Sequence, residues 1–148
     1  MNPIFDGLII IHPEFGMPRN SSYRANLKRY IAECHETGKP VFLVDSDEYP
    51  IRDGEMKKLF DDTFGIPSFE EFTGMQKRQR EIDYISGIIG REPSKSILGF
   101  GGTDASCCVY AHAIGWCREV LTRFEPKLIG VPEKINPISQ GVILGDIV

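Results

Sequence analysis

The sequence has no apolar run close to the roughly 20 residues that a membrane-spanning helix requires, so we expect no membrane partner. It also has no excess of positive charge. Lys and Arg number 17 against 21 Asp and Glu, and the formal net charge of −4 argues against a nucleic-acid partner. The N-terminus shows neither the charged nor the apolar segment of a secretory signal. We therefore expect a cytoplasmic protein.

The few cysteines do not form a disulfide framework. There are four in 148 residues, and Cys107 and Cys108 are adjacent, which is not the spacing of a small stapled domain. No Cys-x-x-Cys pair indicates a zinc site. We expect reduced thiols, no cofactor and no metal. A chain of this length buries a core without staples, so residues 1–148 are expected to form one domain.

Apolar runs that suit buried strands alternate with amphipathic stretches that suit helices. Strands are expected at 7–11, 41–44, 97–101 and 127–132, and helices at 27–34, 56–60, 82–89 and from the paired cysteines onward. Residues 64–74 are expected to be a loop, and the tail at 141–148 to add a strand or dock on another subunit. This alternation predicts an α/β fold, a three-layer α/β/α arrangement with a mostly parallel, Rossmann-like sheet.

Polar groups follow three of these strands. His12-Pro13-Glu14 follows the first strand, residues 45–49 follow the second, and residues 101–108 follow the third. In parallel sheets, sites lie outside the carboxyl ends of the strands, so we expect the three groups to share one edge. The acidic residues among them are Asp45, Asp47 and Glu48; their oxygens suit a divalent cation, and a solvated acidic turn is the alternative.

The segment from Ser96 to Ala113 predicts a strand, a tight glycine turn and a helix that begins near Cys107 and Cys108, with Thr103 or Asp104 as N-cap. Backbone N–H groups and the helix dipole at that position favour a thiolate. Either cysteine is therefore a candidate nucleophile, and a small buried apolar residue is the alternative. His112 lies four residues after Cys108, so a Cys–His pair is possible; a half-buried helix histidine bonded to the backbone is the alternative.

These residues resemble the isochorismatase-like cysteine hydrolases, which include nicotinamidases. The strand and Gly101, the Thr103-Asp104 pair and the Cys108-Val109 pair match that family's pattern, although Thr-Asp is displaced by one residue. Lys77, 30 residues before Cys107, corresponds to the family lysine, with Arg78 as the alternative and a solvated basic face as the plain interpretation. The sequence departs from the family where His12, Glu14 and Tyr49 replace the base Asp, a Gln or Asn, and a metal-site His.

The resemblance implies hydrolysis of a small-molecule amide, imine or vinyl ether through attack by Cys107 or Cys108. His12 would then act as the base in place of the family Asp, with Glu14 orienting it, and the charge of Lys77 would favour the thiolate. Backbone N–H groups near Ser106 and Cys107 would hold the oxyanion. The expected substrate-binding residues are Glu14, Gly101, Gly102, Thr103, Asp104, Ser106 and His112.

Two other functions fit the sequence. The substituted base and the apolar cysteine helix suit an inactive family member that serves as a binding or assembly subunit, and we expect a homo-oligomer. The glycines Gly99, Gly101 and Gly102 suit a small nucleotide-binding Rossmann-like domain, although the full glycine spacing of that motif is absent.

Overall fold

The computed structural model describes residues 6–14, 22–44, 50–91, 98–102, 111–112, 127–129 and 141–144. The strands in these ranges are β1 (Gly7–Ile11), β2 (Val41–Val44), β3 (Phe64–Gly65), β4 (Leu98–Gly102), β5 (Lys127–Ile129) and β6 (Gly141–Leu144). The helices are α1 (Ser22–Glu36), α2 (Gly54–Lys58) and α3 (Gly74–Ile89). None of these helices is long and apolar enough to cross a membrane.

The six strands form one sheet in the order β3-β2-β1-β4-β6-β5. Every neighbouring pair is parallel. In the centre of the sheet, Ile11 at the end of β1 is in register with Val44 of β2 and Gly102 of β4. The three central strands therefore end at the same edge. The predicted α/β class with a Rossmann-like parallel sheet is confirmed.

Strand β1 has four consecutive apolar residues, and they allow it to be buried on both faces of the sheet. Leu8 and Ile10 belong to a core cluster with α1 and α2, whereas Ile9 and Ile11 belong to a second cluster with α3. Side chains alternate between faces along a strand, so a strand covered on both sides needs apolar residues at every position. All four side chains are fully buried.

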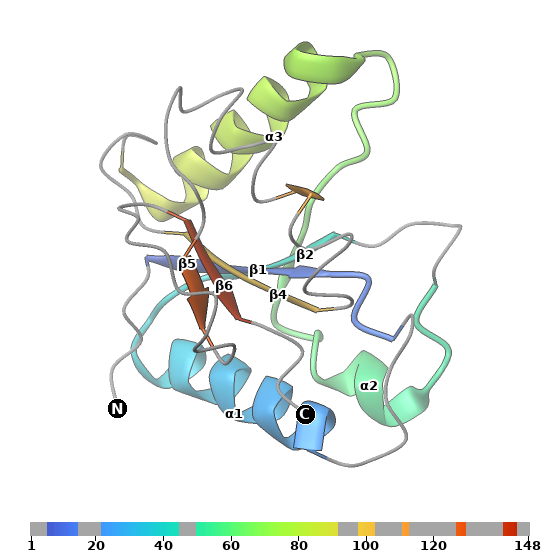
Figure 1. Ribbon diagram of the computed structural model, residues 1–148, viewed down its shortest axis with the longest axis vertical. Helices are drawn as coiled ribbons and strands as arrows, with labels where there is room; N and C mark the ends of the chain where they lie inside the picture. The colour runs from blue at the N-terminus through green and yellow to red at the C-terminus, as the bar shows by residue number, and fades with distance from the viewer. Residues whose placement is uncertain are drawn as a thin grey trace.

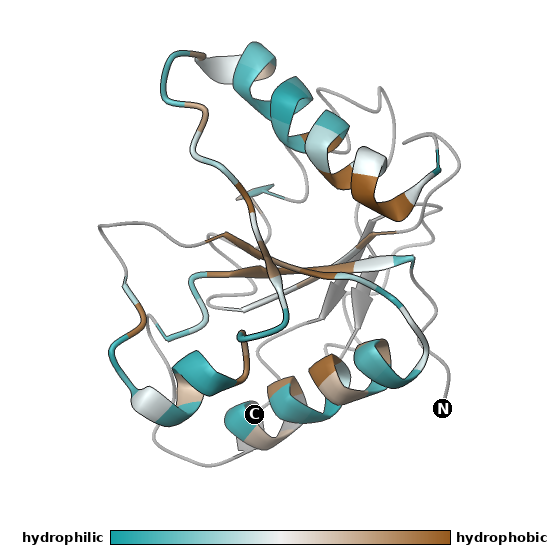
Figure 2. Ribbon diagram, turned by 180° about the vertical axis from the view of Figure 1, so that it is seen from behind, coloured by the Kyte–Doolittle hydropathy of each residue, from teal (hydrophilic) through white to brown (hydrophobic). Residues whose placement is uncertain are grey.

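Two helical layers cover the sheet, with α1 and α2 on one face and α3 on the other (Figure 1). The chain moves outward from β1 to β2 and β3, then returns across the sheet to β4 on the other side of β1. Right-handed crossovers place the helices of these two directions on opposite faces. Figure 2 shows the apolar central strands between helices whose outer surfaces are polar. The order of the strands reverses between β1 and β4, which makes that position the switch point of the sheet.

The structure differs from the sequence prediction in three places. The segment expected to be a loop contains the two-residue strand β3, which pairs with β2. Helix α3 begins at Gly74 instead of near Ile82. Strand β4 continues through its glycines to Gly102, where the absence of a Cβ atom allows a close approach to Ile11. The strand predicted in the tail is present as β6, inserted between β4 and β5.

Candidate functional site

The switch point brings together chain segments that are far apart in the sequence. His12 directly follows β1 and Gly102 ends β4, and the strands before them are in register. The prediction that the segments after the first and third predicted strands share an edge is confirmed at these two residues. Residues 45–49 and 103–108 lie outside the described residues, although Val44 places the end of β2 at the same edge.

His12 is held in an unusual backbone conformation. Its φ angle is 42°, in the left-handed region that non-glycine residues adopt at a cost of about 1–2 kcal/mol. Its backbone N–H donates a hydrogen bond to the carbonyl of Val44 at 3.2 Å, and the residue is only 7% exposed. The imidazole lies against that of His112, with ring centroids 6.1 Å apart and planes at 89°. The turn after β1 thus directs a buried imidazole toward the segment that follows β4.

Gly102 has a steric role in addition to the substrate contact predicted for it. Its φ angle is 114°, and a Cβ atom placed on it would lie 1.9 Å from the carbonyl oxygen of Ile11. Gly101 is buried in the same strand and pairs with Ile10. Both residues, like Gly99, are part of β4. A phosphate-binding loop requires glycines between the strand and the helix, so this placement does not favour the nucleotide-binding alternative.

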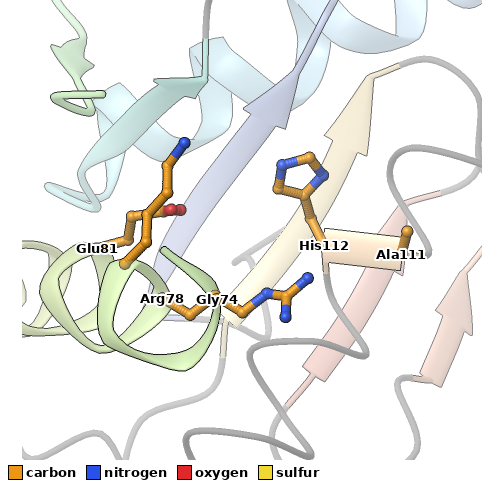
Figure 3. A pocket seen from close by; sticks show the side chains of 6 residues that line it. Gly74, Arg78, Glu81, Ala111 and His112 are labelled. Atoms are coloured by element: carbon orange, nitrogen blue, oxygen red, sulfur yellow. The ribbon is translucent and has the colours of Figure 1, made fainter. Parts of the chain in front are cut away.

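A pocket of about 240 Å³ lies between α3 and the turn of helix at Ala111 and His112 (Figure 3). From α3 it is lined by Gly74, Lys77, Arg78 and Glu81. The crossover helix of a parallel unit runs opposite to its strands, so the first turns of α3 lie beside the carboxyl ends of the strands. The pocket is therefore at the edge where parallel sheets place their ligands.

The side chains from α3 bring both signs of charge into this pocket. Lys77, Arg78 and Glu81 share one face of the helix, because residues three and four apart are neighbours on its surface. Arg78 extends from α3 toward His112 (Figure 3). Glu81 is only 7% exposed, which is rare for a carboxylate. Among the described residues, two cations, one buried carboxylate and one imidazole therefore line the same pocket.

Several of the predicted site residues come together here. Lys77 and its alternative Arg78 both line the pocket, and so does His112, which contacts His12. The third residue of the basic cluster, Arg80, instead stacks its guanidinium over the ring of Phe72 at 4.5 Å. The cluster is thus divided: two of its members face the pocket, and the third is held by an aromatic ring.

Glu14 makes contacts that the sequence did not predict. Its Oε2 atom accepts hydrogen bonds from the backbone N–H groups of Arg52 at 2.7 Å and Asp53 at 3.0 Å. These bonds fix the chain just before α2. The role of Glu14 in orienting His12 or binding substrate stays a prediction.

The two candidate nucleophiles, Cys107 and Cys108, lie outside the described residues. So do Thr103, Asp104, Ser106 and Cys117. Cys34 is described and fully buried in the core that includes α1. Burial, with a smaller contribution from the nearby charge of Glu33, raises the pKa of its thiol from 9.0 to about 12. Because thiolates are the reactive form, Cys34 is an inert structural thiol.

Glu81 is the charged residue of the described pocket lining that the sequence pattern does not predict; Gly74 and Ala111 also line the pocket without a sequence signal. The signal for Glu81 was weak: one acidic residue beside the apolar positions of a helix, four residues after Lys77. Such a residue normally lies on a solvated face, and only the packing of α3 shows that it is buried. In the part of the chain that the structure describes, no three His, Cys, Asp or Glu side chains are grouped to hold a metal ion.

The fold and the pocket together define an α/β protein with a Rossmann-like parallel sheet and a charged pocket at its switch point. Comparisons with protein-family models, with curated proteins and with solved structures found no match to this chain.

Proposed function

We propose that this protein is a divergent cysteine hydrolase of the isochorismatase-like type, acting on a small-molecule amide, imine or vinyl ether. The nucleophile in this proposal is the thiolate of Cys107 or Cys108. The observation that carries the proposal is the pocket at the carboxyl edge of the sheet, which both Lys77 and His112 line, with the ring of His12 6.1 Å from that of His112. These residues were assigned to the site from the sequence, and they come from three separate segments.

The pocket supplies the charge that a reactive thiol requires. A cationic side chain near a cysteine stabilises the thiolate over the thiol. Lys77 and Arg78 both line the pocket beside His112, which is one helical turn from Cys108 in the sequence. Either cation therefore suits the role that the resemblance gives to a lysine.

The histidine pair suits proton transfer. The two rings lie edge to face with centroids 6.1 Å apart, so a proton has only a short distance to cross between them. Imidazole is a common general acid and base in enzymes. This arrangement offers a replacement for the family Asp, whose place is taken by His12.

For an amide substrate, the proposed reaction has two steps. The thiolate sulfur attacks the carbonyl carbon, and the C–N bond breaks as the leaving nitrogen takes a proton from the histidine pair. This step forms a thioester. Water then gives a proton to the pair and attacks the thioester, which releases the carboxylic acid and restores the thiolate.

Alkylation of the native protein with iodoacetamide near pH 7, with each site quantified by peptide mass spectrometry, tests the proposal. We expect Cys107 or Cys108 to react at least about tenfold faster than Cys34, since thiolate fraction and access set the rate. Cys34 is the internal control, because it is buried and its pKa is raised. Equally slow labelling of all four cysteines would contradict the proposal and favour the inactive binding-subunit alternative.

A further inference from the structure

We propose that His12 is a positioning residue for His112. The turn at residues 12–14 holds the imidazole of His12 against that of His112, and His112 is the histidine that faces the substrate. This assignment divides the roles within the histidine pair and so rests on the proposed function for its catalytic meaning. The contact between the two rings involves described residues alone, and it can be tested without any turnover.

The two histidines differ in their access to the pocket. Among the described residues, His112 lines the pocket and His12 does not. His12 is 7% exposed, whereas His112 is only partly buried. A group that exchanges a proton with a substrate must come within hydrogen-bond reach of it. His112 is therefore the better placed of the two to meet a substrate in this pocket, and it is four residues after Cys108 in the sequence.

The backbone of His12 is held in a conformation that an unconstrained chain rarely adopts. Its φ angle of 42° lies in the left-handed region, and such a conformation persists only where the surrounding structure fixes it. The N–H of His12 is fixed by its hydrogen bond to the carbonyl of Val44. The preceding carbonyl, that of Ile11, lies close against Gly102, which has no side chain to keep it away. Both neighbouring strands thus determine the direction in which His12 leaves β1.

Glu14 fixes the other end of the turn. Its Oε2 atom accepts hydrogen bonds from the backbone N–H groups of Arg52 at 2.7 Å and Asp53 at 3.0 Å. Hydrogen bonds to a carboxylate are stronger than those between neutral groups. Only Pro13 separates Glu14 from His12, and a proline has a fixed φ angle. Glu14 therefore acts on the direction of His12 through the backbone of the turn.

The ring of His12 meets that of His112 edge to face. The centroids are 6.1 Å apart and the planes are at 89°, an arrangement that aromatic rings favour because the positive edge of one meets the negative face of the other. Both residues also interact with other groups, so the proposal concerns the direction of the rings and not their charge. The turn supplies a fixed surface on which the ring of His112 packs.

The first experiment measures nuclear Overhauser cross-peaks between histidine ring protons in the full-length protein, which has three histidines. We expect a cross-peak between His12 and His112 and none from the exposed His35. Glu14→Ala leaves both imidazoles in place but removes the bonds that fix the turn, so it should lose this cross-peak. Glu36→Ala is the matched control, because Glu36 is an exposed carboxylate at the end of α1, and it should keep the cross-peak.

The second experiment asks whether His12 acts through His112. The rate at which iodoacetamide labels the two adjacent cysteines at pH 7 is measured in His12→Asn, in His112→Asn and in the double variant. Asparagine is chosen because it tolerates a positive φ angle at residue 12. We expect His112→Asn to slow labelling by up to about tenfold and His12→Asn to slow it less. In the double variant, the loss should equal that of His112→Asn alone.

Additive losses in the double variant would show that His12 acts on the thiol without His112, and they would overturn the proposal. It would also be overturned by a cross-peak that is absent from the parent or unchanged in Glu14→Ala, or by labelling that His112→Asn does not slow. Slow labelling of every cysteine in the parent would contradict only the hydrolase proposal. The cross-peaks would then still decide whether the turn positions His112.

Discussion

At Gly102, the last residue of β4, the backbone lies so close to β1 that a side chain has no room. A methyl group there would lie 1.9 Å from the carbonyl oxygen of Ile11, and the φ angle of 114° is strained for any other residue. We predict that Gly102→Ala lowers the free energy of unfolding by about 3 kcal/mol or more, because β1 and β4 must separate or the backbone must change its conformation. Chemical denaturation followed by circular dichroism measures the loss.

Gly87→Ala is the matched control for this substitution. Gly87 is exposed within α3, and a Cβ atom on it would contact nothing within 4 Å. Alanine favours helix over glycine by about 1 kcal/mol, so this variant should be as stable as the parent or slightly more stable. If Gly102→Ala had as little effect on the free energy of unfolding as Gly87→Ala, the close contact between Gly102 and Ile11 would be contradicted.

The short helix α2 depends on contacts at its beginning. The carboxylate of Asp53 accepts hydrogen bonds from the backbone N–H groups of Glu55 and Met56 and from Arg24 of α1, the last at 2.6 Å. The Glu55 N–H bond, followed by that from Arg24, holds the pKa of Asp53 below its ordinary value of 3.8. Glu14 secures the same segment through the backbone of Asp53. A five-residue helix is thus fixed by side chains from two other segments.

We predict that Asp53 contributes stability above about pH 3.8 and that this contribution is lost as the pH falls through its lower folded-state pKa. Asp53→Asn keeps a capping oxygen but removes the charge, so the variant should melt at a lower temperature than the parent at pH 7. The difference should shrink as the pH falls below 3.8. Thermal unfolding from pH 7 to pH 2.5 measures both effects.

Asp61→Asn serves as the comparison, since Asp61 is an exposed carboxylate just after α2. This variant should melt like the parent near neutral pH. A melting difference between Asp53→Asn and the parent that stays the same at every pH would show that the charge of Asp53 is not the source of its effect.

The elements that the sequence predicted are those with an apolar pattern. Strands β1 and β2 are runs of apolar residues, and the second half of α3 repeats isoleucine at helical spacing. The first half of α3 has no such pattern, because its side chains face the pocket and the solvent; Met75 is 61% exposed. Strand β3 is two exposed residues long and depends on its pairing with β2. Its formation is a tertiary effect that local sequence does not specify.

At the scale of the whole molecule, the order of the strands determines which residues meet. The sequence predicted a parallel sheet with polar groups at one edge, and this was sufficient to place His12 near the end of β4. It did not predict that the chain crosses from β3 to β4 over the face covered by α3. That crossing brings Lys77, Arg78 and Glu81 to His112, so the pocket results from topology and not from a sequence motif.

This placement of α3 leads to a prediction about thiol reactivity. If Lys77 stabilises the thiolate of Cys107 or Cys108, Lys77→Met should raise the pH midpoint of iodoacetamide labelling by about one unit and slow the reaction at pH 7 by up to about tenfold. Lys57→Met is the control, because Lys57 lies on α2, on the opposite face of the sheet, and should leave the labelling profile unchanged. An unchanged profile in Lys77→Met would remove Lys77 from this role, and the same measurement on Arg78→Gln would then decide whether its neighbour supplies the charge.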